Sequence, residues 1–381
     1  MQKWYTCRYM RILLAAGIYP PDIGGPATYA RLIEDELPHQ DIAVTVIPYH
    51  SVRHVPKLFR HTAYFLRLLK SARGTDLIYA LDPVSVGLPA LLVSKLLGRP
   101  FLLRLGGDYA WEQGSQRFGI TATLDTYTTH TVGRPFPVRV LARLQSFVAV
   151  RAKLVIVPSA YLGQIVARWG VPPARLKVIH SAPAPLVVSE SRSTLRDTFN
   201  YSGEVLVSVA RLTPWKGMDA LISLVAQRRK RGIDTKLVIV GDGPLRSVLE
   251  SKATELGLAG SVVFLGALTR TELGAVIKAA DVFILNTAYE GLSHQLLEVM
   301  SIGTPIITTP VGGNPELITD QVEGLLVPVD DIAGYDAAVD ILMNNSDVRF
   351  ACIAAAKQKI KAFDSKRALL DLGELLRQSV Q

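Results

Sequence analysis

The sequence predicts an α/β protein made of two doubly wound, Rossmann-like domains. Short apolar runs rich in β-branched residues alternate with amphipathic helical stretches, and the alternation occurs twice, with about six strands each time. The length of 381 residues suits two domains of ordinary size. Hydrophobic residues make up 49% and charged residues 20% of the chain, which is typical of a folded globular protein and excludes a mostly disordered one.

The expected elements follow from the hydrophobic periodicity. The strands expected in the first half are residues 11–17, 43–50, 76–82, 101–106, 154–159 and 177–180, with helices at 28–37, 58–71 and 85–97. The strands expected in the second half are residues 205–210, 237–241, 262–265, 282–286, 305–308 and 324–328, with helices at 217–231, 244–256, 270–279 and 293–302 and three more after Asp331. A Pro- and Ser-rich stretch with little periodicity places the domain boundary near residues 182–203. Two such domains are expected to form a cleft at the carboxyl ends of their strands, where open α/β sheets bind ligands.

Cysteine content and the length of the apolar runs exclude several other classes of protein. Cys7 and Cys352 are too few for a disulfide framework or a four-thiolate zinc site, so a reducing compartment is expected. The most apolar stretch, residues 84–97, is shorter than the roughly 20 residues of a membrane-spanning helix. No signal peptide is expected, because the apolar run after Met10 suits a first strand, and the protein starts at either the first methionine or Met10.

The net charge of +9 is distributed unevenly. Residues 1–190 contain 22 Lys and Arg against 11 Asp and Glu, whereas the remaining residues contain 20 against 22. Basic side chains alternate with aromatic and aliphatic ones in residues 53–73 and again in residues 134–153, a pattern that favours helices lying on an anionic membrane surface. Packing helices with solvated Lys and Arg faces are the alternative. No nucleic-acid-binding motif occurs, so a nucleic-acid partner is not expected.

The strongest local motif runs from Glu290 to Glu298, between an expected strand and an expected helix. Ser293 suits the N-cap position, so Glu290 precedes the helix and Glu298 lies inside it. At ~1.5 Å per residue the two carboxylates would stand roughly 10 Å apart, about the reach from a sugar ring to the ribose of a nucleotide sugar. The N–H groups and the positive dipole at the helix start suit a phosphate. Taken alone, the spacing also fits two surface glutamates beside a capped helix.

Further candidate residues follow other strands of the second half. Arg211 and Lys216 lie where the first of these strands enters its helix, and two fixed cations there suit a diphosphate. Gly-rich turns follow at V-G-D-G-P, which contains Gly241, at the turn that ends in Leu268, and at residues 308–316. Their glycines permit a close backbone approach to a ligand. Neither a dinucleotide fingerprint nor a Walker A motif is present.

Two segments of the first half offer candidates at strand ends. Gly24 and Gly25 follow the first expected strand and open a helix, which fits an anion cradle or an ordinary strand-to-helix turn. Asp108 follows the fourth expected strand and is close in sequence to Tyr109 and Trp111. The two aromatic rings suit stacking on a sugar, and the alternative is a buried aromatic pair behind a capping Asp108.

Taken together and in this order, the motifs resemble those of the family 4 retaining glycosyltransferases, or glycosyltransferase group 1, which have the GT-B fold. The similarity is specific over residues 205–328 and weaker in the first half beyond residue 40, where acceptors differ. It implies an acceptor-side domain at residues 1–187 and a nucleotide-sugar-binding domain at residues 188–362, facing each other across a cleft. A C-terminal helix at residues 363–381 would return to the first domain.

The resemblance also implies roles for single residues. Arg211 and Lys216 would bind the donor diphosphate. Glu290 would bind hydroxyls of the donor sugar, and Glu298 would bind the ribose hydroxyls. The other donor-side residues implied are Gly241, Leu268, Gly291, Leu292, Ser293 and His294, together with Gly24 and Gly25, which would approach the donor phosphate or the acceptor.

The sequence departs from the family pattern in two places. Asp108 stands where many members have a His, and we expect it to take over part of that acceptor-side role. The segment His180-Ser-Ala replaces an Asn-Gly pair, which puts contacts from that loop in doubt. His294 falls where the family varies, and it either contacts the donor or fills space at the helix start.

The implied reaction transfers a sugar, with retention, from a nucleoside-diphosphate sugar to a glycan or lipid-linked acceptor in cell-surface polysaccharide or glycolipid synthesis. Arg211, Lys216, Glu290 and Asp108 form the expected catalytic set, acting mainly on the charge of the leaving group. Neither a cofactor nor a metal is expected, and no D-x-D triplet occurs. We expect the protein in the cytoplasm, or peripheral on the inner face of the cell membrane. The alternatives are a GT-B relative such as a nucleotide-sugar epimerase or phosphorylase, or a non-catalytic basic membrane-binding protein.

Overall fold

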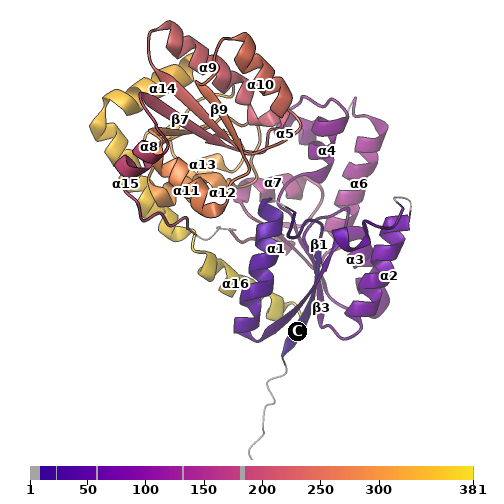
Figure 1. Cartoon of the computed structure of the whole chain (residues 1–381). Helices are drawn as coiled ribbons and strands as arrows, with labels where there is room; N and C mark the ends of the chain where they lie inside the picture. The colour runs from indigo at the N-terminus through magenta and orange to yellow at the C-terminus, as the bar shows by residue number, and fades with distance from the viewer. Residues whose placement is uncertain (1–8, 23, 57–58, 131–132, 181–184, 381) are drawn as a thin grey trace, which may run out of the picture. The chain divides into compact units, whose positions relative to one another are not determined.

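The computed structural model describes residues 9–380, except residues 23, 57–58, 131–132 and 181–184. Cys7, Lys57, Leu58 and residues 182–184 of the expected domain boundary therefore lie outside the described residues. The chain divides into two compact units (Figure 1). Unit 1 contains residues 1–181 and 365–381, and unit 2 contains residues 182–364.

Unit 1 is built around a six-stranded parallel sheet with the strand order β2-β1-β3-β4-β5-β6. Its strands are β1 (Met10–Ala16), β2 (Ile42–Pro48), β3 (Leu77–Ala80), β4 (Phe101–Arg104), β5 (Leu154–Val157) and β6 (Leu176–Val178). Its α-helices are α1 (Gly25–Glu36), α2 (Arg60–Ala72), α3 (Gly87–Leu97), α4 (Tyr109–Arg117), α5 (Leu124–Thr129), α6 (Phe136–Arg151), α7 (Ala160–Arg168) and α16 (Ser365–Gln378).

The strands of unit 1 bury side chains on both faces of the sheet. Along β3, Ile78 belongs to one apolar cluster and Tyr79 to another, because successive side chains of a strand point to opposite faces. Every residue of β3 and β4 is buried. This is the pattern of a parallel sheet that helices cover on both sides.

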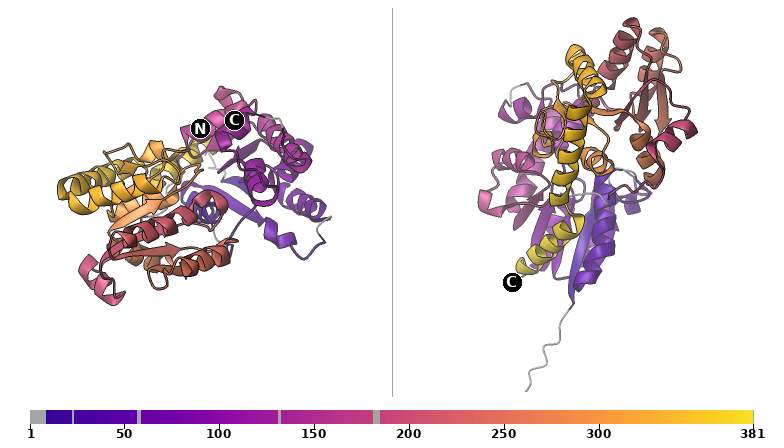
Figure 2. Two further views of the ribbon diagram at one scale, coloured as in Figure 1. Left: turned by 90° about the horizontal axis from the view of Figure 1, so that it is seen from above. Right: turned by 90° about the vertical axis from the view of Figure 1, so that its left-hand side faces the viewer.

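Helix α16 packs into unit 1, although it comes from the far end of the chain. Leu369, Leu372 and Leu376 enter the apolar cluster that also contains residues of β1 and α1. Gln40 Nε2 donates to the carbonyl oxygen of Leu369 at 3.0 Å, and Lys153 Nζ donates to that of Ser379 at 2.7 Å. Figure 2 shows this last yellow helix against the indigo and purple elements of unit 1.

Unit 2 has the same architecture, with the strand order β12-β11-β10-β7-β8-β9. Its strands are β7 (Glu204–Val209), β8 (Thr235–Val240), β9 (Val262–Gly266), β10 (Val282–Leu285), β11 (Ile306–Thr308) and β12 (Leu325–Leu326). Its α-helices are α8 (Arg192–Thr198), α9 (Met218–Lys230), α10 (Arg246–Glu255), α11 (Arg270–Ala279), α12 (His294–Ile302), α13 (Asn314–Leu317), α14 (Ile332–Asn344) and α15 (Ser346–Lys359). The two six-stranded parallel sheets confirm the predicted fold class.

The expected boundary segment contains a helix that the sequence analysis did not anticipate. Ser191 caps α8 by accepting a hydrogen bond from the N–H of Thr194 at 3.1 Å. Arg192 and Arg196 both form ion pairs with Asp281, which precedes β10. The polar composition of this stretch therefore reflects a capped helix tied by charge to unit 2, and periodicity over only seven residues was too short to reveal it.

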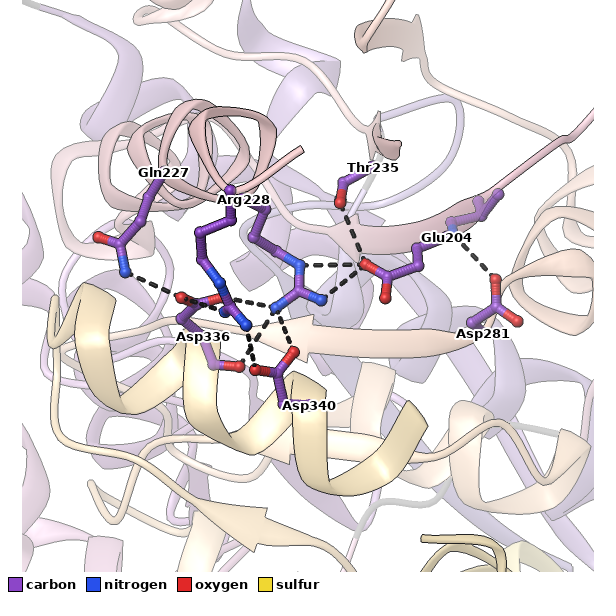
Figure 3. Close-up of polar contacts among 9 residues, drawn as sticks. Glu204, Gln227, Arg228, Thr235, Asp281, Asp336 and Asp340 are labelled. Atoms are coloured by element: carbon purple, nitrogen blue, oxygen red, sulfur yellow. Dashed lines mark hydrogen bonds and ion pairs between the residues drawn. The ribbon is translucent and has the colours of Figure 1, made fainter. Parts of the chain in front are cut away.

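A buried ionic cluster joins α9 and α14 to the start of the sheet in unit 2 (Figure 3). Arg228, whose side chain is 0% exposed, donates to Glu204 at 2.7 and 3.1 Å. The same guanidinium forms ion pairs with Asp336 and, at 3.0 Å, with Asp340. Arg231 also binds both aspartates, at 2.7 and 2.8 Å. A buried guanidinium is tolerated here because several carboxylates surround it.

Candidate functional site

The candidate residues of unit 2 gather at one edge of its sheet. Strands β7 and β10 are neighbours, but β7 continues through α9 toward β8 on one side and β10 continues through α12 toward β11 on the other. Their carboxyl ends therefore form the topological switch point, where the two connections diverge and leave a crevice for a ligand. Arg211 and Lys216 follow β7, whereas Glu290, Ser293 and Glu298 follow β10.

The loop after β7 is held by a buried amide. Gly217 has a φ of 50°, in the left-handed region that favours glycine, and a Cβ there would lie 2.2 Å from Asn286 Nδ2. Asn286 Nδ2 donates to the carbonyl oxygen of Gly217 at 2.9 Å and to Asp330 Oδ1 at 2.7 Å. Tyr335 Oη donates to Asn286 Oδ1 at 3.1 Å. This network fixes the backbone position of Lys216, the residue before Gly217.

A second set of contacts brings the β10 loop against the β7 loop. The N–H of Ala288 donates to the carbonyl oxygen of Trp215 at 2.8 Å, and Thr287 Oγ1 donates to the same oxygen at 3.2 Å. As a result, Lys216 Nζ forms an ion pair with Glu290 Oε1. The two side chains are only 12% and 13% exposed. Arg211 is exposed, and no carboxylate of the described residues lies within 4 Å of its guanidinium.

The glycines of the loop after β11 are explained by packing against Glu290. A Cβ on Gly312 would lie 2.1 Å from the carbonyl oxygen of Glu290, and one on Gly313 would lie 2.3 Å from that of Gly291. The N–H of Gly313 donates to the Glu290 carbonyl oxygen at 2.9 Å. These glycines let one backbone segment support another, so they position Glu290 whether or not they also approach a ligand.

Helix α12, labelled in Figure 1, begins four residues after Glu290. Ser293 is its N-cap and accepts a hydrogen bond from the N–H of Leu296 at 3.3 Å, while His294 is the first helical residue. Leu292 is buried in the apolar core, so only its backbone is available to a ligand. Gly291 is also buried. The dipole and the first N–H groups of α12 give this end of the helix an affinity for anions.

Glu298 lies inside α12 and is 7% exposed. Burial raises the pKa of its carboxyl group, and the guanidinium of Arg270, at 2.8 Å from Oε1, opposes that rise. Arg270 begins α11 and was not among the predicted site residues. A basic residue at the first position of a helix after a strand end was its only sequence signal.

The other predicted donor-side residues of unit 2 support neighbouring loops. A Cβ on Gly241 would lie 2.0 Å from the carbonyl oxygen of Ala210, so the V-G-D-G-P turn packs on the segment that carries Arg211. Leu268 is half-buried and packs against the core beneath α11 and α12. The turn at Gly241 thus acts on the position of Arg211 through the backbone.

In unit 1 the switch point lies between β1 and β3. Gly24, with a φ of 146°, precedes α1, and its carbonyl oxygen accepts from the N–H groups of Ala27 and Thr28; Gly25 begins the helix. Asp82 follows β3 and was missed by the sequence analysis. Its carboxylate accepts from the N–H groups of Val84 and Ser85 at 2.9 and 2.6 Å, and a Cβ on Gly17 would lie 2.1 Å from it. Burial raises the pKa of Asp82 to about 6.

Asp108 is fully buried and is the N-cap of α4. Its Oδ1 accepts from the N–H of Trp111 at 2.9 Å and from Gln145 Nε2 at 2.9 Å. Burial raises the pKa of the Asp108 carboxyl group. Trp111 is only 2% exposed and donates Nε1–H to the carbonyl oxygen of Ala122, so its ring does not offer a stacking face. Of the two alternatives that the sequence left open, the structure therefore supports a buried Trp111 behind a capping Asp108.

Neither a metal-binding cluster nor a membrane-spanning helix occurs in the part of the chain that the structure describes. Within those residues, no group of three or more His, Cys, Asp or Glu side chains is arranged to hold a metal ion. None of the described helices combines the length and the apolar composition needed to cross a membrane.

Comparison with known protein families finds a matching family model for each unit. The model of glycosyl transferases group 1 matches residues 196–359, and the model of the glycosyl transferase 4-like domain matches residues 2–182. The chain belongs to the group 1 glycosyltransferases. This confirms the resemblance drawn from the sequence motifs.

Curated relatives of this group 1 chain share about a quarter to a third of its residues over the matched stretches. The GDP-mannose-dependent alpha-(1-6)-phosphatidylinositol monomannoside mannosyltransferase of Mycolicibacterium smegmatis is 34% identical over 170 residues, which is 42% of this chain and 44% of the relative. The D-inositol 3-phosphate glycosyltransferase of Salinispora arenicola is 26% identical over 305 residues, 72% of this chain and 67% of the relative. The chain thus covers less than half of the first relative's length.

Solved structures show the same fold for this group 1 chain. Anabaena HepE in complex with UDP and glucose has a TM-score of 0.76 at 20% identity, with 97% of this chain and 99% of that chain covered. Sucrose-phosphate synthase from Thermosynechococcus elongatus has a TM-score of 0.81 at 20% identity, with 97% and 98% covered. The fold is therefore GT-B, with two Rossmann-like units.

Proposed function

We propose that this chain transfers a sugar from a nucleoside-diphosphate sugar to a glycan or lipid-linked acceptor, with retention of configuration and without a bound metal. The observation that supports this most is the convergence at the β7/β10 switch point. Two cations, Arg211 and Lys216, lie at the same edge as Glu290 and the start of α12. This is a charge pattern for a diphosphate that carries a hydroxyl-rich group.

In this proposal the leaving nucleoside diphosphate is stabilised by groups that are already in place. Lys216 supplies a point charge fixed by Glu290 and by the Asn286 network, Arg211 supplies a planar fork, and α12 supplies N–H groups. Because these groups do not need to reorganise during the reaction, they favour departure of the diphosphate. The leaving phosphate would help to deprotonate the acceptor hydroxyl, and no carboxylate nucleophile is assigned.

The remaining donor contacts are proposed on the same edge. Glu290 would accept hydrogen bonds from the sugar hydroxyls through the oxygen that Lys216 does not bind. Glu298 would accept from the ribose hydroxyls, and Arg270 opposes the rise in its pKa that burial causes. Leu268 would border the base, and His294 would lie beside the phosphate or the sugar.

The acceptor side is proposed at the β1/β3 edge of unit 1 and the neighbouring end of β4. Gly24 and Gly25 leave space for a close approach of substrate to the start of α1. Asp82 is a titratable group at this edge, and Asp108 acts by fixing the first turn of α4. Asp108 is therefore proposed as a positioning residue for the acceptor loop.

The relatives suggest the donor and the setting. The mycobacterial relative uses GDP-mannose by its name, and HepE was solved with UDP and glucose. The same mycobacterial relative is named for phosphatidylinositol monomannoside, and a relative from Rhizobium meliloti is named for lipopolysaccharide core biosynthesis. We therefore propose a GDP- or UDP-sugar donor and a role in cell-surface polysaccharide or glycolipid synthesis, with the protein in the cytoplasm or peripheral on the inner face of the membrane.

Nucleotide binding tests this proposal directly. Thermal unfolding of the protein is measured with UDP, GDP, ADP and their sugars, with and without a chelator. A ligand at one hundred times its Kd adds about 2.7 kcal/mol to the free energy of unfolding. One nucleoside diphosphate should raise the Tm regardless of chelator. The Arg211→Ala, Lys216→Ala variant should lose the shift, and Lys230→Ala, an exposed residue of α9, should retain it.

Two results would contradict the proposal. A well-folded protein that responds to none of these nucleotides would exclude the donor site. A nucleotide response without sugar transfer to any glycan or lipid acceptor would favour an epimerase- or phosphorylase-like reaction. The anomeric configuration of a transferred sugar, read by NMR, tests retention.

A further inference from the structure

Unit 1 contains a cavity of about 670 Å³ that is rich in arginine. Five arginines line it, contributed by the segment before α6, by α6 itself and by α7: Arg134, Arg139, Arg143, Arg151 and Arg168. Helix α6 contains no acidic residue. The cavity lies within one unit, and its wall includes Asp108, whose helix α4 packs beside α6 (Figure 1).

Three of these arginines are already engaged by the protein. Arg168 forms an ion pair with Asp125 at 3.1 Å. The guanidinium of Arg134 stacks 3.8 Å above the ring of Tyr127 and donates to backbone carbonyl oxygens. The guanidinium of Arg151 stacks 3.7 Å from the ring of Phe147. Stacking positions a guanidinium but leaves its charge uncompensated.

The other two, Arg139 and Arg143, are not compensated by any carboxylate within 4 Å among the described residues. The guanidinium of Arg139 lies 5.7 Å from the centroid of the Phe136 ring, a contact that leaves its charge uncompensated. They are four residues apart on α6 and therefore lie on the same helical face, where like charges destabilise a helix by a few tenths of a kcal/mol. An anion bound between them would reverse the sign of this interaction.

Tyr127 provides a second, independent indication of a ligand. Its side chain lines the cavity and is 4% exposed, yet its hydroxyl is buried without a hydrogen-bond partner among the described residues. Burial raises the pKa of this hydroxyl to about 12, so it stays protonated and can donate. Buried polar groups are normally paired, and an acceptor oxygen in the cavity would satisfy this one.

We propose that this cavity binds a phosphate or diphosphate group carried by the acceptor, with Arg139 and Arg143 as the principal ligands and Tyr127 as a donor. The name acceptor rests on the proposed function, whereas the binding of phosphate does not. Guanidinium groups match phosphate oxygens in pairs, which distinguishes this site from a diffuse basic surface. Asp108 is the carboxylate in the wall, and its Oδ1 is occupied by the N–H of Trp111 and by Gln145.

The surroundings favour a phosphate that belongs to a lipid. Helix α6 also exposes Phe136 at 69%, Val140 at 44% and Phe147 at 41%. Phe147 is itself part of the cavity wall. Apolar side chains beside a phosphate site suit an acyl or prenyl chain that leads away from the charged group.

Calorimetric titration of the full chain with inorganic diphosphate tests the site. The donor site of unit 2 would also bind this probe, so the titrations use the Arg211→Ala, Lys216→Ala background. Adding Arg139→Gln and Arg143→Gln should weaken binding at least tenfold. Adding Arg67→Gln and Lys70→Gln, which removes two exposed charges from α2, should change it less than twofold. Equal effects of the two pairs, or no saturable binding, would overturn the proposal.

Vesicle sedimentation separates a lipid-borne phosphate from a soluble one. The probe is phosphatidylcholine with 10 mol% phosphatidic acid, compared with phosphatidylcholine alone. A lipid source predicts retention by the anionic vesicles that Arg139→Gln, Arg143→Gln abolishes. Val140→Ser, which removes an exposed apolar side chain of α6 outside the cavity lining, should lower vesicle retention without weakening diphosphate binding. Diphosphate binding without vesicle binding supports the phosphate site with a soluble acceptor. Nucleotide shifts with UDP or GDP report on unit 2 separately, so failure of the proposed transfer activity is distinguishable from failure of this site.

Discussion

We expect the carboxyl group of Asp82 to make the folded chain less stable at neutral pH than at acidic pH. In the folded chain burial raises its pKa from the ordinary value of 3.8 to about 6, against the opposing effect of the N–H groups of Val84, Ser85 and Val86. The folded state therefore binds the proton more tightly than the unfolded state does. The free energy gained from this proton is present below pH ~4 and is lost as the pH rises through about 6. At 1.36 kcal/mol per pKa unit, the loss is about 3 kcal/mol.

Replacing Asp82 by Asn should remove this dependence, because the amide is neutral and its oxygen can still accept from the same N–H groups. The free energy of unfolding is measured by urea titration of wild type and variant between pH 4.5 and pH 8. We expect Asp82→Asn to be more stable than wild type by about 1 kcal/mol at pH 4.5 and by an amount approaching ~3 kcal/mol at pH 8. Asp35→Asn, at an exposed position on α1, is the control and should show no such divergence. A difference between Asp82→Asn and wild type that stays constant across this range would refute the reasoning.

Three further predictions follow from unit 2. Arg228→Met should lower the free energy of unfolding by about 3 kcal/mol, because it leaves Glu204 without its cation and Asp336 with Arg231 alone. Urea unfolding measures this loss, and Lys230→Met, at an exposed position, is the control. Gly312→Ala should reduce transfer activity by displacing Glu290, whose carbonyl oxygen lies 2.1 Å from the new Cβ. The control Gly260→Ala, at a φ of 81° with open space around the new Cβ, should lower only stability, so steady-state kinetics and Tm distinguish the two variants. Arg270→Met should raise the pKa of Glu298 further, because it removes the cation beside the carboxylate. On acidification, the affinity of the variant for UDP or GDP should therefore begin to fall at a higher pH than that of wild type. A Kd that is unchanged across the pH range would contradict the ribose role of Glu298.

The sequence predicted secondary structure and local motifs better than contacts between residues that are far apart in the chain. Alternating apolar and amphipathic stretches located the strands of both sheets, because each is a local, periodic signal. The motif around Glu290 was located for the same reason. The ion pair between Glu290 and Lys216 was not predicted. The loop that carries Lys216 is held by Asn286, and a single polar residue gives no periodic signal in the sequence. Asp82 was missed because its significance depends on the order of strands in the sheet.

The glycine-rich turns show a related limit. In the sequence their glycines indicate either a close ligand or a strained turn, and both readings use the same residue. In the structure Gly241 contacts the backbone of Ala210, and Gly312 that of Glu290. Each of these turns supports a neighbouring loop of the candidate site. A substitution at either glycine should therefore act on the site through the backbone, even if no ligand touches the glycine itself.

The two basic stretches of unit 1, which look alike in the sequence, differ in what their charges contact. In residues 53–73, Arg53 pairs with both carboxylate oxygens of Asp22, and Arg60 donates to the carbonyl oxygens of Arg53 and Val55. In residues 134–153, Arg139 and Arg143 lack such partners among the described residues and, unlike the exposed Arg67 and Lys70 of the first stretch, they line a cavity. An excess of positive charge attracts anions in general, but only charges left uncompensated and held together can select one. We therefore expect the basic residues of α6, rather than those of α2, to select a particular anion. Removing the charges of α2 should weaken the attraction to an anionic surface without changing which anion the α6 cavity binds.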